Sequence, residues 1–295
     1  MEISPPTIVF GEGNFLEGIR WHEGRWWLSD HRGGQVRAIT PSGDVEVITT
    51  VAGRPSGLGW LPDGDLIIAS MRDRLVLRCS SDYEVSVHAD LSGIVEDRIN
   101  DMTVNSVGQA FVGSVGTKSG DRSLEVKAAP VIRVDPDGTF EIAASDLMCP
   151  NGMDFLDGGR TLVVAESFGG GLTAFTVDPS GSLSDRRSWA QIGHRPDPAT
   201  VAEMHSQLQF APDGLSAMGD GTVWVADVKS GRCFHLAPGG AILDEIQPPH
   251  GEMVFACAVG GEDGRTLALC VAPDWEEEKR LANRDSKLIT YALGD

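Results

Sequence analysis

The amino-acid sequence predicts an all-β fold, a six-bladed β-propeller with four-stranded blades. Three observations predict this fold. A polar residue followed by a small one, and then by an apolar stretch, opens six similar segments along the 295 residues, less clearly in the last. Apolar residues recur at every second position within these segments, which is the period of a half-buried strand. In every segment a glycine and a second apolar stretch follow, as in a β-hairpin.

The first residue of each repeated segment is called its head. The heads are Glu17, Ser56, Asn100, Asn151, Asp213 and Phe255. The turn glycine comes seven to nine residues later, at Gly24, Gly64, Gly108, Gly158, Gly221 and Gly264. A third apolar stretch follows in most segments, and a weaker fourth is visible as VEVITT, EVSVHA and TFEIAA. Four antiparallel strands per repeat form a propeller blade, so six heads predict six blades.

The last repeat contains only three strand patterns and ends at Leu288–Ala292. We expect Thr7–Phe10 to pair as the outer strand of this last blade, because that pairing closes the ring and removes an open sheet edge. The rival fold, a sandwich of two sheets, does not explain six copies of one pattern. Residues 1–295 are therefore predicted to form a single propeller domain.

Two gaps between heads are longer than the others and indicate insertions. They cover residues 116–129, which are rich in charge, and residues 193–208, which we expect to contain a short helix. Insertions in repeat folds lie on one face and often cover the binding site.

Composition narrows the range of partners. The formal net charge of −19 argues against nucleic acid and anionic membranes, since both require a basic surface. No signal peptide is recognisable, and no apolar run approaches the roughly 18 residues of a membrane span. The five cysteines show no paired spacing and are read as free buried thiols. We expect a soluble, cytoplasmic protein, as a monomer or a small homo-oligomer.

Equivalent positions in a closed ring converge on its axis, so the heads predict a polar site at the mouth of the central tunnel. Glu17 and Asp213 would repel each other there without a cation. Ser56 is read as a small packing residue, while Asn100 is left open between a metal ligand, a substrate contact and a turn cap. Oxygen donors of this kind favour one divalent ion, with Ca²⁺ first and Mg²⁺, Mn²⁺ or Zn²⁺ as alternatives.

The triplet Pro-Asp-Gly shows that the position of a residue in the repeat is more informative than the short motif around it. It occurs three times, at residues 62–64, 136–138 and 212–214. The first two copies fall where the repeat requires a hairpin turn, and Asp-Gly is ordinary turn chemistry there. Only Asp213 falls at a head, so its position in the repeat, and not the triplet itself, marks it as a candidate ligand.

At these positions the chain resembles the senescence-marker-protein, gluconolactonase and luciferin-regenerating-enzyme family. The resemblance covers nearly the whole chain and is most specific in four segments: RPSGLGWLPDG, RINDMTVNSVGQAFVGS, CPNGMDFLDGGRTLVVAES and APDGLSAMGDGTVWVAD. It implies a six-bladed propeller with one divalent ion and a lactone-hydrolysing activity. Motif by motif, it implies Glu17, Asn151 and Asp213 as metal ligands and Arg98 and Asn100 as substrate-binding residues.

The chain departs from the family pattern at two of these motifs. Ile19 stands where the family usually has proline after Glu-Gly, and His31 stands where an apolar residue is common. The sugar that the site accepts is therefore not implied by the resemblance.

Opening a lactone requires a polarised carbonyl, an activated water and a stabilised oxyanion. A divalent ion supplies the first and third, and a neighbouring carboxylate supplies the second, for which Asp213 is our candidate catalytic base. His31 and His205 are candidate proton shuttles. A small polar lactone or ester is thus the expected substrate.

Two alternative functions fit the same residues. A cation that polarises a carbonyl also polarises a P=O group, so a phosphotriesterase-like hydrolase is one alternative. A non-catalytic metal-binding propeller that serves as a binding platform is the other. The polar ring of heads argues against the platform, because a scaffold does not require paired acids in its tunnel.

Overall fold

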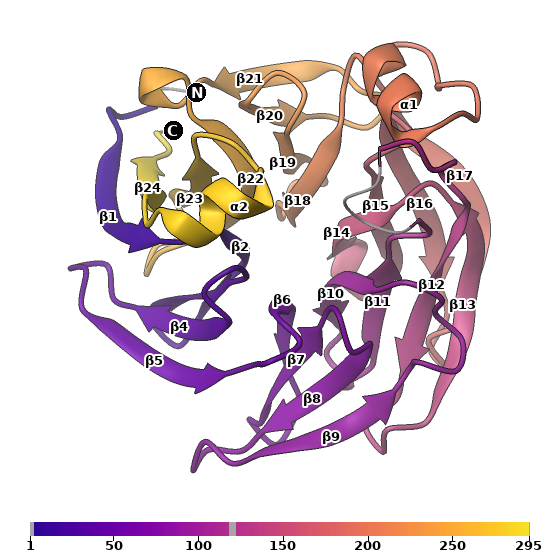
Figure 1. The fold of residues 1–295 in the computed structure, drawn as a ribbon, viewed down its shortest axis with the longest axis horizontal. Helices are drawn as coiled ribbons and strands as arrows, with labels where there is room; N and C mark the ends of the chain where they lie inside the picture. Colours follow the sequence, from indigo (N-terminus) through magenta and orange to yellow (C-terminus); the bar gives the residue numbers. More distant parts are fainter. Residues whose placement is uncertain (1–2, 118–121, 295) are drawn as a thin grey trace.

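The computed structural model of the chain describes residues 3–117 and 122–294. Its strands form six four-stranded antiparallel sheets arranged radially around one axis, which confirms the predicted propeller (Figure 1). Residues 118–121, which belong to the first predicted insertion, lie outside the described part of the chain.

In the first five blades the strands follow sequence order from the axis outwards. Blades 1 and 2 consist of β2 (Leu16–His22), β3 (Arg25–Asp30), β4 (Gln35–Ile39), β5 (Val45–Thr50), β6 (Pro55–Trp60), β7 (Leu66–Ser70), β8 (Leu75–Cys79) and β9 (Val85–Asp90). Blades 3 and 4 consist of β10 (Ile99–Val104), β11 (Ala110–Ser114), β12 (Ala129–Val134), β13 (Phe140–Leu147), β14 (Pro150–Leu156), β15 (Thr161–Glu166), β16 (Gly171–Val177) and β17 (Leu183–Gln191). Blade 5 consists of β18 (Pro212–Ala217), β19 (Val223–Asp227), β20 (Arg232–Leu236) and β21 (Ile242–Ile246).

The sixth blade joins the two ends of the chain. Its strands are β22 (Met253–Gly260), β23 (Thr266–Ala272), β24 (Ser286–Ala292) and, outermost, β1 (Thr7–Gly13). The pairing of β1 with β24 is antiparallel, with Thr7 opposite Thr290 and Gly13 opposite Ser286. The predicted closure by the N-terminal strand is therefore confirmed, and β1 is three residues longer than the apolar pattern at Thr7–Phe10 indicated.

The hydrophobic core lies between the blades. Six clusters of buried apolar side chains each join one blade to the next, so that every interface of the ring is filled. In the cluster between blades 6 and 1, for example, Leu16 and Trp26 pack with Ala268 and Leu288. Because each sheet is covered on both faces by its neighbours, its inner strands are apolar on both sides.

The outermost strands of blades 4 and 5 were not visible in the sequence. In β17 five consecutive residues, from Ser184 to Ser188, are exposed, and in β21 Ile242 and Leu243 are exposed as well. An outermost strand has no neighbouring blade to pack against, so its sequence does not need the apolar alternation that marks the inner strands.

The segment 193–208 contains α1 (Val201–Gln207), which begins where Thr200 and Glu203 form a capping box. Its backbone pairs with the other insertion, since Val201 N donates to Leu124 O and Val126 N donates to Ala199 O. The loop between β23 and β24 contains α2 (Glu277–Ala282), and single 3-10 turns occur at Asp157–Gly159 and Pro249–Gly251. Within the described residues, no helix is long and apolar enough to cross a membrane.

The glycines that follow four of the heads, at Gly18, Gly57, Gly152 and Gly214, let neighbouring innermost strands approach closely. A Cβ atom at Gly152, which follows Asn151, would lie 2.6 Å from the Cα of Gly214 and closer still to the carbonyl oxygen of Asp213. Real Cβ atoms do not approach backbone atoms this closely, so glycine is required here for blades 4 and 5 to meet.

We expect Gly152→Ala to lower the free energy of unfolding by at least about 1–3 kcal/mol, because the added methyl group overpacks the seam between two blades. Gly219→Ala is the matched control, because a Cβ there meets no atom within 4 Å, and it should change stability by less than about 0.5 kcal/mol. Urea unfolding of both variants checks this. Equal stabilities would contradict the close approach.

Candidate functional site

The heads of blades 1 to 5 occupy the same place in the structure, the second residue of the innermost strand. Glu17 has this place in β2, Asn151 in β14 and Asp213 in β18. Directly after each head the pairing with the next strand shifts register, between Glu17 and Arg20 in blade 1 and between Pro212 and Leu215 in blade 5. Such a β-bulge bends the strand and re-aims its side chains, which is typical of strands that build a site.

Asn151 and Asp213 are in direct contact across the seam between blades 4 and 5. The amide nitrogen of Asn151 donates to Asp213 Oδ1 and, at 3.1 Å, to the hydroxyl of Ser167. Ser167 in turn donates to the carbonyl of Pro212 at 2.7 Å. These bonds hold two of the three predicted ligands together.

Glu17 lies against His31 at the end of β3. Its Oε1 atom is 2.9 Å from His31 Nδ1, yet this buried oxygen has no partner in hydrogen-bond geometry among the described residues. The other ring nitrogen, Nε2, lies 3.1 Å from Nη1 of Arg32. A guanidinium only donates, so Nε2 accepts and the proton of a neutral His31 is on Nδ1, facing Glu17 and the carbonyl of Pro55.

Negative charge accumulates at the axis. Burial raises the pKa of Asp213 well above its ordinary value, and the nearby Glu17 and Asp101 raise it further, while the bond from Asn151 lowers it. Burial also raises the pKa of Asp101, although Arg20 opposes this with an ion pair at 3.0 Å. Carboxylates held together in this way are stabilised by a cation, because an opposite charge favours the ionised form.

These residues fit a divalent cation of the hard, oxygen-binding class. The fit rests on the buried Glu17 oxygen without a hydrogen bond and on the crowding of Glu17 and Asp213. No three histidine, cysteine, aspartate or glutamate side chains of the described residues gather as a metal cluster. A cation held here would therefore take two carboxylates, the amide oxygen of Asn151 and water, a donor set that suits calcium better than thiophilic metals.

Asn100 and Arg98 lie beside the same strands. Asn100 is buried, and its amide donates at 3.2 Å to the carbonyl of Pro150, which is the residue before Asn151. Arg98 is largely buried and pairs with Asp97 at 3.1 Å. Its charge also acts on Cys149, whose pKa is raised to about 12, first by burial and then by Asp213, with Arg98 opposing. Asn100 thus contacts the strand that carries Asn151, whereas Arg98 is linked to this region only through its charge.

His205 lies on α1, away from this network of contacts. Its ring packs against Trp275, which precedes α2, with a centroid distance of 5.2 Å. Burial lowers the pKa of His205, and the charges of Lys229 and Arg122 lower it further, so the ring is neutral near pH 7. No hydrogen bond or ion pair among the described residues joins it to Asp213.

Of four arginines near the site, the sequence predicted only Arg98, although the repeat marks the positions of Arg32, Arg54 and Arg72 as well. Arg54 and Arg98 stand two residues before the heads Ser56 and Asn100, while Arg32 and Arg72 stand two residues after the ends of β3 and β7. The same register that identified the heads could have identified these positions. Their acidic partner, Glu277, lies outside the repeat and carries no such signal.

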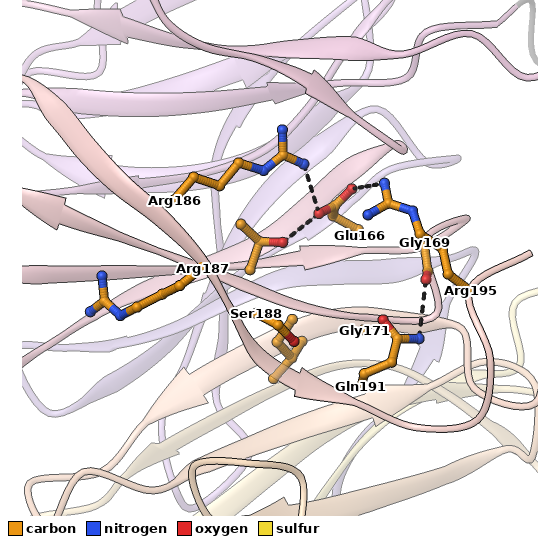
Figure 2. Close-up of a pocket in the computed structure, with 10 residues that line it drawn as sticks. Glu166, Gly169, Gly171, Arg186, Arg187, Ser188, Gln191 and Arg195 are labelled. Carbon is orange, nitrogen blue, oxygen red and sulfur yellow. Dashed lines mark hydrogen bonds and ion pairs between the residues drawn. The ribbon is translucent and has the colours of Figure 1, made fainter.

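A separate cavity of about 240 Å³ lies on blade 4, between β15, β16 and β17 (Figure 2). Glu166 is buried at its wall and binds the hydroxyl of Thr173, with Arg186 at 3.3 Å and Arg195 at 3.4 Å. The lining includes none of the predicted ligands. Glu166 is therefore interpreted as a structural carboxylate whose hydrogen bonds and ion pairs are satisfied, and the cavity is not assigned as the reacting site.

Comparison with known proteins agrees with the propeller fold. The chain is 26% identical over 225 residues to 6-deoxy-6-sulfogluconolactonase of Pseudomonas putida, an alignment that spans 76% of this chain and 71% of that enzyme. Among solved structures, a luciferin-regenerating enzyme superposes with a TM-score of 0.77 at 16% identity, covering 98% of this chain and 95% of the other. A calcium-binding protein, regucalcin, from Agrobacterium tumefaciens superposes with a TM-score of 0.75 at 18% identity, covering 95% and 90%.

The two structural likenesses, at these identities, show the fold. The family is shown by a family model, described as the SMP-30/Gluconolactonase/LRE-like region, which matches residues 15–272. That range includes every predicted ligand and both predicted substrate residues. The chain belongs to the SMP-30/gluconolactonase/LRE-like family.

Proposed function

We propose that this protein is a divalent-metal-dependent hydrolase that opens a small polar lactone. One observation carries the proposal: Glu17, Asn151 and Asp213 stand at the same place in the innermost strands of three blades, and a buried oxygen of Glu17 has no hydrogen bond from any described residue. Lactonases and a calcium-binding protein among the relatives support both parts of it. Calcium is the proposed ion, and Mg²⁺, Mn²⁺ or Zn²⁺ are alternatives.

The proposed reaction adds water across the ring ester. The oxygen of the attacking water bonds to the carbonyl carbon, the bond from that carbon to the ring oxygen breaks, and the product is a hydroxy acid. A bound divalent ion supplies polarisation of the carbonyl and stabilisation of the oxyanion. Ionised Asp213 takes a proton of the attacking water as the general base, and a proton is returned to the ring oxygen as its bond to the carbon breaks.

Other side chains of the site position these groups. We propose that Asn100 and Arg98 orient the substrate. The hydrogen bond to the Pro150 carbonyl fixes the Asn100 side chain next to Asn151, and the charge of Arg98 reaches Cys149, two residues before Asn151. His31 is proposed to position Glu17 by packing against it, with Nδ1 2.9 Å from Oε1 and the ring held by the Pro55 carbonyl and by Arg32. His205 would shuttle a proton only if α1 moved towards the axis.

Replacing Asp213 tests the metal and the base together. We expect Asp213→Asn to abolish the rise in unfolding temperature that Ca²⁺ causes and to lower kcat/KM for a sugar lactone by roughly 10²-fold or more. Thermal unfolding and a pH-stat assay measure the two effects. Asp137→Asn is the matched control. Asp137 lies in another copy of the Pro-Asp-Gly triplet, in an exposed turn, where its carboxylate accepts hydrogen bonds from Thr139. Metal-dependent turnover retained by Asp213→Asn would overturn the proposal.

A substrate panel separates this proposal from its two alternatives. We expect the protein with added Ca²⁺, Mg²⁺, Mn²⁺ or Zn²⁺ to hydrolyse lactones faster than a phosphotriester, because the product of ring opening matches the polar site. The reverse preference would favour the phosphotriesterase-like reading. Metal binding without turnover of any compound in the panel would favour a binding platform.

A further inference from the structure

Three arginines gather around one carboxylate beside the proposed metal site. Oε1 of Glu277 is 2.8 Å from Nη2 of Arg54 and 2.7 Å from Nη2 of Arg72, and its Oε2 is 3.5 Å from Nη1 of Arg32. This group, Arg32, Arg54 and Arg72, is called the arginine cluster. It stands out in a chain with 43 acidic and 24 basic residues, where cations are outnumbered almost everywhere.

The arginine cluster is connected to the predicted ligands by direct contacts. Nη1 of Arg32 is 3.1 Å from His31 Nε2, and His31 Nδ1 is 2.9 Å from Glu17 Oε1. The charges of Arg72 and Glu277 also act on the proposed substrate residue Arg98. A molecule bound at the proposed metal site would lie one side chain, that of His31, away from the cluster.

The cluster has hydrogen-bond donors to spare. The side chains of Arg54 and Arg32 are 11% and 12% exposed. Nη1 of Arg54 and Nε of Arg32 are buried and have no hydrogen-bond partner among the described residues. Buried donors without partners destabilise the folded state, and three like charges repel, so stability alone does not explain this arrangement.

The backbone at Arg54 supports a functional reading. Arg54 has φ of 71°, in the left-handed region that residues other than glycine seldom occupy. Two hydrogen bonds hold it there, from Arg54 N to Val51 O at 3.1 Å and from Met71 N to Arg54 O at 2.8 Å. Strained residues of this kind cluster at binding sites, where the surrounding structure holds them in place.

Glu277 already shows what the cluster binds. Its hydrogen bond from Arg54 is the largest of the effects that lower its pKa to about 2, so the carboxylate stays ionised near neutral pH. Its side chain is 42% exposed, and it opens α2, a helix of six residues in a loop. The carboxylate is thus an oxyanion that the cluster already binds at the edge of the site.

We propose that the substrate of the proposed lactonase carries an oxyanion group, which the arginine cluster binds in place of Glu277 or beside it. The group is a carboxylate, a sulfonate or a phosphate, each of which offers the paired oxygens that guanidinium groups bind. This inference rests on the proposed function for the reaction, while the recognition of the anion rests on the cluster itself. Arg32, Arg54 and Arg72 then decide which lactones enter.

The test compares a neutral sugar lactone with lactones of the same ring size that carry a carboxylate, a sulfonate or a phosphate. We expect kcat/KM for at least one anionic lactone to exceed that for the neutral one, and added salt to reduce this preference. Arg72→Gln should lower the ratio of anionic to neutral kcat/KM by about 10- to 100-fold. Glu277→Gln should raise it, because the competing carboxylate is gone. Arg187→Gln, at an exposed arginine of β17, is the matched control and should leave the ratio unchanged.

A binding measurement keeps the two proposals distinguishable. Calorimetric titration with inorganic phosphate should show binding to the wild-type protein that Arg72→Gln weakens and Glu277→Gln strengthens, whether or not any lactone is hydrolysed. Hydrolysis of neutral lactones with no preference for anionic ones would overturn this inference and leave the proposed function standing. Phosphate binding that depends on Arg72, without hydrolysis of any lactone, would overturn the proposed function and leave the anion site standing.

Discussion

Closing six sheets into one ring brings the ends of six innermost strands to a common axis, and the other features of the site depend on this convergence. The ring stays closed because β1 pairs with β24 and because each seam between blades is filled with apolar side chains. It can be narrow at the axis because Gly152 lets β14 approach β18. Residues more than a hundred positions apart in the sequence, such as Glu17 and Asp213, are therefore held within electrostatic reach.

This convergence creates two regions of opposite charge next to each other. At the axis the acids Glu17, Asp101 and Asp213 raise the free energy of one another's ionised forms, which favours a cation. At the edge, Arg32, Arg54 and Arg72 compete for Glu277, which favours an anion. His31 contacts both regions through its two ring nitrogens. A cation and an anionic substrate bound side by side would satisfy both.

The strands that face a neighbouring blade could all be predicted, whereas the outermost strands of blades 4 and 5 could not. Inner strands are covered on both faces by neighbouring blades and are therefore rich in apolar residues, so their pattern is present in the sequence, as in β15, which is buried throughout. The outermost strand β17 has five consecutive exposed residues and leaves no such pattern. The positions of the heads could be predicted from the repeat alone. The β-bulge after Glu17, which re-aims its side chain, could not be predicted from the repeat.

The sequence by itself determined the number of blades, the closure of the ring and the positions from which Glu17, Asn151 and Asp213 extend, because repeats carry their own register. Only the tertiary structure decided which residues are neighbours across blades. The bond from Asn151 to Asp213, the contact of His31 with Glu17 and the meeting of three arginines at Glu277 join residues that no local pattern relates. The reason is physical: a period along the chain specifies direction towards the axis, whereas charge and hydrogen bonding at the axis depend on distances that exist only once the ring has closed.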